Sequence, residues 1–392
     1  LRVAKHLDEQ VRFALEIFKR KLMDASNITT TPSFTPSTLY PTLNTTFNPN
    51  TTLNESGTSP TAPNIIFLTY VGILVCIITF ALLGNLVVII VFLFDRKLRV
   101  SSNYYIFSLA VADVITAALV MTFEVDQWLN NLKWRYSRVL CKAWTTAYLF
   151  TVPVSILTTC LSSIDRWYAI SRPLQYRTNR NGLKHKALVA IILIWIYSIL
   201  FALLPEFGWN PPGASHGVKE DSPYCFFDIY IEYSILSSVL HFILPSLVTA
   251  FFYYNMFKAM KTHTMHRRRM SSGSDCSHAR GPSQTKRTTN QRKEQRINFR
   301  HNVSLAKSYA LIGSLLILTW CPHSIISIMQ NTCYYNQSRS YGCGNIMDIS
   351  DDTVTSFLLL GYFNSALNPI VYVLRFRQFR LTLMECVTCK KH

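Results

Sequence analysis

Asp113 is the residue of this chain whose chemistry most needs an explanation. It lies in the middle of a long apolar run, where an ionised carboxylate is unstable unless it is paired or hydrated. Ser155, Asn364 and Asn368 fall at a comparable depth in two other apolar runs and can supply oxygen ligands. Hard cations prefer such ligands. The pattern therefore indicates either a bound cation or a network of carboxylate, water and amides without an ion.

The elements that must position these residues are seven long apolar runs. Each run is long enough to cross a bilayer as a helix, which takes about 20 apolar residues. Charged residues make up only 15% of the chain, against about 25% in a soluble domain, and soluble proteins seldom repeat such runs. The predicted spans are 64–94, 102–126, 138–168, 187–206, 229–260, 303–330 and 353–375.

Basic residues gather between alternate runs and give the chain a formal net charge of +18. They are densest in the segment 261–302, whereas acidic residues occupy the other connections. Short loops rich in Lys and Arg remain cytoplasmic. We therefore expect a multi-pass plasma-membrane protein with an extracellular N-terminus and a cytoplasmic C-terminus. The membrane accounts for the basic residues, so no nucleic-acid partner is expected.

The two flanks of the apolar region differ in character. Residues 1–63 are predicted to be a disordered extracellular tail, rich in Ser, Thr, Asn and Pro from residue 25. Its first 22 residues look like a basic amphipathic helix, and our hypothesis is that translation begins at Met23 and that they are a gene-model extension. N-glycosylation is predicted at Asn27, Asn44, Asn50 and Asn54. Residues 376–392 form a short amphipathic segment and tail, in which Cys386 and Cys389 are candidate palmitoylation sites.

The motifs within the seven runs resemble those of the rhodopsin-like (class A) G-protein-coupled receptors, over roughly 63–390. The matching residues are Asn85, Asp113, Asp165-Arg166-Trp167, Trp195, Pro245, Trp320-Cys321-Pro322 and Asn368-Pro369-Ile370-Val371-Tyr372. The resemblance implies an all-α integral membrane fold: a seven-transmembrane helix bundle over 64–375 with a short amphipathic eighth helix. It also implies a receptor, not an enzyme, whose partners are a heterotrimeric G protein, arrestin, a receptor kinase and membrane lipid.

The resemblance assigns roles to several buried polar residues. Sodium, as an allosteric ion and not a required cofactor, would bind at Asp113, Ser155, Asn364 and Asn368. Arg166 would be held by Asp165 at rest and would move on activation. The other switch residues implied are Tyr253, Pro245, Pro322, Asn368, Pro369 and Tyr372.

Two residues depart from the family pattern near this switch. The sixth run has Asn302 where many relatives keep an acid to hold the arginine, and it has Leu316 where a phenylalanine is usual. A weaker hold on Arg166 predicts raised basal activity.

The resemblance also pairs the cysteines on the outer side. We expect a disulfide between Cys141 and Cys225 and a second between Cys333 and Cys343, with free thiols as the alternative for each pair. Cys76, Cys160 and Cys321 are expected to be buried packing residues.

The short sequence motifs around this core are most similar to those of receptors for small biogenic amines, including the muscarinic and histamine groups. Those receptors anchor the ligand ammonium with an aspartate where this chain has Tyr148, a phenol that is neutral at pH 7. Glu124 is the candidate replacement anchor; the alternative is a hydrated rim residue. The other expected ligand-binding residues are Val152, Ser237, Ser238, His241, Trp320, His323, Ser324 and Tyr362.

Other functions on a seven-helix fold fit less well. A light-sensing pigment needs a lysine at the position of Tyr362, and an ion pump needs more titratable groups across the membrane. We therefore expect a cell-surface receptor that binds a small extracellular ligand and activates heterotrimeric G proteins through the basic segment 261–302. The alternatives are a non-amine or peptide ligand, and a constitutively active orphan receptor.

Overall fold

The computed structural model describes residues 65–130, 132–209, 214–215, 218–219, 223–225, 229–272, 282–335 and 351–388. Side chains of 263–264, 266–272, 282–302, 330–335 and a few residues near other segment ends are outside the description. The four glycosylation candidates, Cys343 and Cys389 lie outside the described residues, as do the side chains of Asn302, Cys333 and Cys386.

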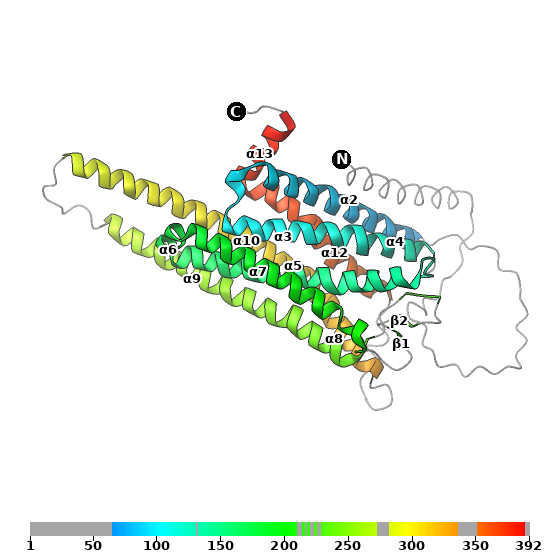
Figure 1. Ribbon diagram of the computed structural model, residues 1–392. Coiled ribbons are helices and arrows are strands. Elements are labelled where there is room, and N and C mark those ends of the chain that lie inside the picture. The colour runs from blue at the N-terminus through cyan, green and yellow to red at the C-terminus, as the bar shows by residue number, and fades with distance from the viewer. Residues whose placement is uncertain are drawn as a thin grey trace, which may run out of the picture.

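Within the residues that the structure describes, seven helices are long and apolar enough to cross a membrane, as predicted from the sequence. They run side by side as a bundle (Figure 1). The spanning segments are Phe67–Phe94, Ser101–Leu129, Arg138–Ser171, Arg180–Ala202, Glu232–Thr262, Val303–Met329 and Asp352–Arg375. The predicted fold class is therefore confirmed.

In chain order the bundle begins with α2 (Ile65–Phe94) and a short turn, η1 (Arg96–Leu98). The second span comprises α3 (Ser101–Ile115), η2 (Thr116–Met121) and α4 (Thr122–Leu129). The third and fourth are α5 (Arg138–Ser171) and α7 (Arg180–Ala202), joined by α6 (Pro173–Thr178). The fifth comprises α8 (Ile231–Ser238), η4 (Val239–Ile243) and α9 (Leu244–Ser272). The sixth and seventh are α10 (Pro282–Tyr335) and α12 (Asp351–Arg375), and α13 (Arg377–Thr388) follows.

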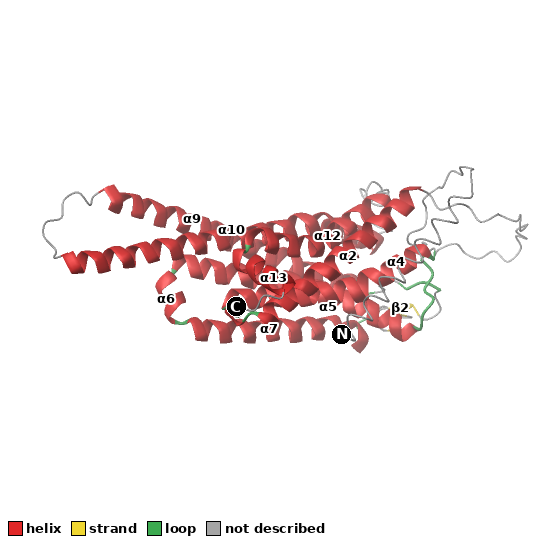
Figure 2. Ribbon diagram, turned by 90° about the horizontal axis from the view of Figure 1, so that it is seen from above, coloured by secondary structure: helices red, strands yellow, loops and turns green. Residues whose placement is uncertain are grey.

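Three helices extend further than the apolar runs predicted. The fourth begins at Arg180 instead of 187, α9 continues to Ser272, and α10 begins at Pro282 instead of 303. These extensions are rich in Lys, Arg and Gln, which favour helix without being apolar. Proline is well suited to the first position of a helix, which explains where α10 begins. Consequently α9 and α10 project beyond the rest of the bundle (Figure 2).

Two of the spans contain a π-helical turn that the sequence did not predict. Thr116–Met121 interrupts the second span and Val239–Ile243 interrupts the fifth. Such turns are rare and often occur at functional sites. Both turns involve residues expected to contact the ligand: Glu124 follows the first turn by three residues, and His241 lies within the second.

Buried polar side chains connect the helices at several levels. Asn85 donates a hydrogen bond from Nδ2 to the carbonyl oxygen of Ser365 at 3.0 Å. Trp195 Nε1 donates to Ser108 Oγ at 3.0 Å, and Trp144 Nε1 donates to the Val120 carbonyl at 3.1 Å. These bonds join α2 to α12, α7 to α3, and α5 to the π-helical turn of the second span.

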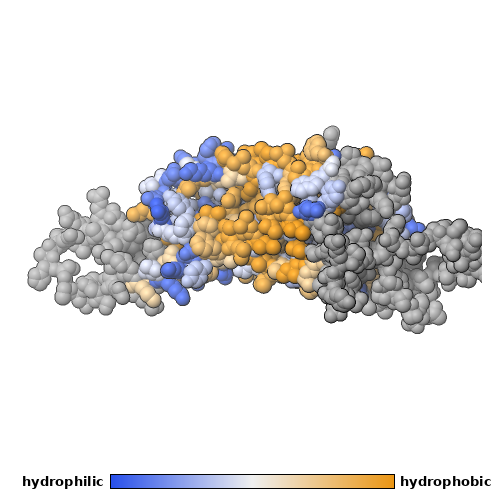
Figure 3. All heavy atoms as spheres, turned by 90° about the horizontal axis from the view of Figure 1, so that it is seen from below, coloured by the Kyte–Doolittle hydropathy of each residue, from blue (hydrophilic) through white to orange (hydrophobic). Residues whose placement is uncertain are grey.

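The outside of the bundle is an apolar belt. Figure 3 shows hydrophobic side chains across the middle of one face, with hydrophilic side chains beside them. Large apolar side chains are exposed on different spans, among them Phe80, Leu193, Leu247 and Leu318. Of the three cysteines expected to be buried, Cys160 is buried but Cys76 and Cys321 are exposed. The expectation was wrong for those two because they lie on the outer faces of their helices.

The ends of the bundle are fixed by specific contacts. The predicted disulfide between Cys141 and Cys225 is present, with a Cα–Cα distance of 5.8 Å, and it holds the loop that carries β1 (Ala214–Ser215) and β2 (Val218–Lys219). At the opposite end, Thr382 of α13 donates a hydrogen bond to Asp95 Oδ2 at 2.9 Å. Partial burial raises the pKa of Asp95, but hydrogen bonds from Lys97 N, Thr382 and Gln378 outweigh this and hold its pKa below the usual range.

Candidate functional site

A carboxyl group in the half of the bundle that carries the Cys141–Cys225 disulfide makes a direct contact between two helices. The Tyr362 hydroxyl of α12 donates a hydrogen bond to Glu124 Oε2 of α4 at 2.8 Å. Tyr362 is fully buried and Glu124 is half-buried. Within the described part of the chain, no lysine, arginine or histidine forms an ion pair with Glu124. The site therefore presents a carboxyl group whose described partner in the protein is a neutral hydroxyl.

Aromatic rings pack against Tyr362, the hydrogen-bond partner of this carboxylate. The ring of Trp320 lies edge-on to Tyr362 at 6.0 Å between centroids, and Phe242 lies 6.1 Å from Trp320. Tyr148 and Val152 of α5 pack into the same hydrophobic cluster. The structure thus brings together Glu124 and four of the predicted ligand-binding residues. A ring-bearing cation would find a counter-charge and aromatic faces in one place.

The polar residues predicted on the fifth and sixth spans have partners within the protein. His241 is buried, with Nε2 3.0 Å from the Tyr197 hydroxyl and Nδ1 3.1 Å from Ser237 Oγ. Ser238 donates to the Ser234 carbonyl and Ser324 to the Trp320 carbonyl, each one turn earlier in its own helix. His241 and Ser237 therefore form part of the contact with α7.

His323 is the residue of this predicted set closest to the aromatic cluster. The ring of His323 lies edge-on to the ring of Trp320, with 6.0 Å between the two centroids. The next residue, Ser324, donates its hydrogen bond to the Trp320 carbonyl. It is half-buried. The structure therefore places His323 against Trp320.

The carboxylate of Asp113 lies at the centre of the bundle and is fully enclosed. Ser365 Oγ donates a hydrogen bond to Asp113 Oδ1, and Asn368 Nδ2 donates to Oδ2, both at 2.8 Å. Ser155 is buried on α5, and Asn364 Oδ1 is buried without a hydrogen-bond partner among the described residues. Asp113 and this orphaned amide oxygen are the kind of ligands a hard monovalent cation takes. The residues present therefore fit a sodium ion, and Ser365 joins the predicted set.

The arginine at the opposite end of the third span is also enclosed. Arg166 is 3% exposed and forms an ion pair with its neighbour Asp165. Arg166 Nη2 donates to the Tyr176 hydroxyl at 2.6 Å, and that hydroxyl lies 3.1 Å from Asp165 Oδ2 as donor. Ser101 of α3 donates to Asp165 Oδ1 at 3.1 Å. The charge pair is thus covered from the loop helix α6 and from α3.

The other predicted switch residues lie on three further helices. Tyr253 of α9 donates from its hydroxyl to the Tyr309 carbonyl of α10 at 2.6 Å. The Tyr372 hydroxyl on α12 is buried and has no hydrogen-bond partner among the described residues. Pro245, Pro322 and Pro369 lie within α9, α10 and α12, where each removes one backbone donor.

Comparison with known proteins gives a family and several relatives for this chain. A family model described as "7 transmembrane receptor (rhodopsin family)" matches residues 84–372. The chain is 30% identical to octopamine receptor beta-2R of Drosophila melanogaster over 83% of this chain and 62% of the relative. It is 29% identical to 5-hydroxytryptamine receptor 4 of Homo sapiens over 83% of this chain and 80% of the relative. It is 26% identical to the alpha-1D adrenergic receptor of Sus scrofa over 81% and 56%. The chain thus spans less than two thirds of the fly and pig relatives.

Proposed function

The chain belongs to the rhodopsin family of seven-transmembrane receptors, and we propose that it is a cell-surface receptor for a small cationic ligand that activates a heterotrimeric G protein. The ligand enters from the extracellular side, where the disulfide-bonded loop lies. The G protein binds the opposite end, at Arg166 and the projecting ends of α9 and α10. Arrestin, a receptor kinase and membrane lipid are the further partners we propose.

The ligand class follows from the relatives and from one contact. The relatives are named as receptors for octopamine and 5-hydroxytryptamine, which are aromatic amines. The hydrogen bond between Glu124 and Tyr362 is the observation that carries the proposal. It supports Glu124 as the group that receives the ligand ammonium, in place of an acid at Tyr148. The rings of Trp320 and Phe242 are placed to pack against the aromatic part of such a ligand.

We further propose that sodium binds at Asp113 with Ser155, Ser365 and Asn364 supplying neutral oxygens. A cation would supply the counter-charge that the carboxylate lacks at this depth. The protein groups themselves hold the carboxylate in place through Ser365 and Asn368. The ion is allosteric in this proposal, and ligand binding does not require it.

The experiment measures G-protein recruitment in cells that express the wild type, Glu124→Gln or Glu232→Gln. Glu232 is an exposed carboxylate at the outer end of α8 and is the matched control. The panel contains octopamine, 5-hydroxytryptamine and other aromatic amines, each beside its uncharged N-acetyl derivative. Arg166→Ala serves as the variant that reaches the surface without coupling.

The expected result is that at least one amine activates the wild type and Glu232→Gln, but not Glu124→Gln, and that the N-acetyl derivative is inactive. An amine response of unchanged potency in Glu124→Gln would refute the anchor. If the wild type is silent and Tyr148→Asp gains an amine response, the cationic-ligand proposal is refuted and a non-amine ligand takes its place.

A further inference from the structure

Tyr309 of α10 contacts three other helices, one of them through Arg166. Its ring lies under the Arg166 guanidinium, with 5.1 Å from Cζ to the ring centroid. Its hydroxyl donates a hydrogen bond to the Ser102 carbonyl of α3 at 3.0 Å. Its own carbonyl accepts the hydrogen bond from Tyr253 of α9 at 2.6 Å. One buried residue of the sixth span therefore touches the second, third and fifth spans.

We propose that Tyr309 is the resting-state clasp of this receptor, and that it replaces the acidic side chain for which the chain has Asn302. An acid would hold the arginine by charge. Tyr309 holds it by a cation–π contact in a buried site, where such contacts are strongest. The inference rests on the proposed function, because the clasp matters only if α10 moves away from α5.

The geometry ties the clasp to the position of α10. Moving the cytoplasmic half of α10 outward separates the Tyr309 ring from Arg166 and breaks the bond to Ser102 in the same step. Gly313, one turn further along α10, lets Tyr253 approach closely. A Cβ atom added there would lie 2.7 Å from Cε2 and from the hydroxyl oxygen of Tyr253. The small residue at 313 is therefore part of the same arrangement.

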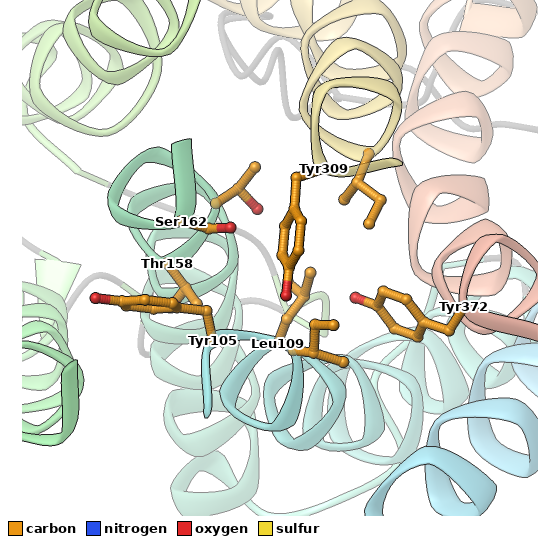
Figure 4. A pocket seen from close by; sticks show the side chains of 9 residues that line it. Tyr105, Leu109, Thr158, Ser162, Tyr309 and Tyr372 are labelled. Atoms are coloured by element: carbon orange, nitrogen blue, oxygen red, sulfur yellow. The ribbon is translucent and has the colours of Figure 1, made fainter. Parts of the chain in front are cut away.

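A small cavity adjoins the Tyr309 ring and has room for about one water molecule. Figure 4 shows Tyr309 pointing into it from α10, with Tyr372 entering from α12 and Ser162 from α5. The Ser162 and Tyr372 hydroxyls are both buried without hydrogen-bond partners among the described residues. A water molecule here would have both hydroxyls as hydrogen-bond partners.

The test compares Tyr309→Leu, Tyr309→Phe and the wild type, with signals normalised to surface expression. The readout is G-protein recruitment without ligand. Phenylalanine keeps the ring over Arg166 but loses the bond to Ser102, so we expect basal recruitment to rise about 3-fold. Leucine loses both contacts, and we expect a rise of about 10-fold. Tyr254→Leu, an exposed substitution on the neighbouring α9, is the matched control and is expected to leave basal recruitment unchanged.

A second readout separates this inference from the proposed function. Nitroxide labels on Thr178→Cys and Lys307→Cys, both exposed, report the distance between α6 and α10 in the ligand-free protein. In Tyr309→Leu we expect a larger population of long distances, even if no amine activates any variant. Unchanged distances and unchanged basal recruitment in Tyr309→Leu would refute the clasp. Lower surface expression with no rise in basal signal would mean that Tyr309 is a packing residue only, which also refutes it.

Discussion

The sharpest prediction concerns the strength of the contact between Glu124 and a cationic ligand. Removing one partner of a desolvated charge pair costs about 2 to 5 kcal/mol. Glu124 is half-buried, so we expect a value near the lower end, about 2.7 kcal/mol. At about 1.4 kcal/mol for each factor of ten, Glu124→Gln weakens amine binding about 100-fold. Equilibrium binding of the most potent amine to membranes measures this directly.

Tyr362→Phe makes the prediction stricter because its hydroxyl acts on the ligand through Glu124. Loss of a hydrogen bond to a charged group costs about 1.5 kcal/mol, so Tyr362→Phe alone weakens binding about 10-fold. In the Glu124→Gln background the hydroxyl meets a neutral amide, and the same change weakens binding by only about 2-fold. Full additivity in this double-mutant cycle, or equal effects of Glu124→Gln and Glu232→Gln, would refute the reasoning.

Three further predictions concern the central carboxylate, the contact of Tyr253 with α10 and the docking of α13. Ser365→Ala removes one of the two hydrogen bonds on the central carboxylate, so the sodium dependence of thermal stability is expected to fall, as measured on purified protein in sodium and in choline chloride. Gly313→Ala displaces the Tyr253 ring, and ligand-free G-protein recruitment is expected to rise about 3-fold, since a neutral hydrogen bond is worth about 0.5 to 1.5 kcal/mol. The pKa of Asp95 is lowered in the folded protein, so its contribution to docking of α13 is present at neutral pH and is lost as the pH falls through that pKa; hydrogen exchange of α13 measures this, and Thr382→Val is expected to remove the pH dependence.

The seven spans were predictable from the sequence because each consists of one long apolar run. The ends of the helices were less predictable, because hydropathy does not detect the part of a helix that lies in water. The extension of α10 back to Pro282 and the early start of α7 at Arg180 are polar and rich in Lys and Arg, which have good helix propensity. The two π-helical turns could not be predicted from the spacing of apolar residues. Each turn shifts the helical phase locally, and packing, not residue type, determines where it occurs.

The candidate site was predicted as a set of residues and not as a set of contacts. The pattern pointed to Asp113 and Asn368, but Ser365 stands next to Asn364 in sequence and only the phase of α12 decides which of them reaches the carboxylate. Tyr309 and Tyr176 could not be singled out among 20 tyrosines, because their function depends on a guanidinium that is distant in sequence. A buried arginine whose usual acidic partner is missing was the one available signal that another residue holds it.

The length of α10 has a mechanical consequence. From Pro322, where the helix loses a backbone hydrogen bond, to its start at Pro282 the helix runs 40 residues. At 1.5 Å per residue this is a rigid arm of about 60 Å. A rotation of about 5° at the proline would displace the far tip by about 5 Å, while the side chains one turn from the pivot move by less than about 1 Å. A ligand that shifts Trp320 by a fraction of an ångström therefore causes a much larger displacement at the far end of α10. That displacement is large enough for another protein to respond to.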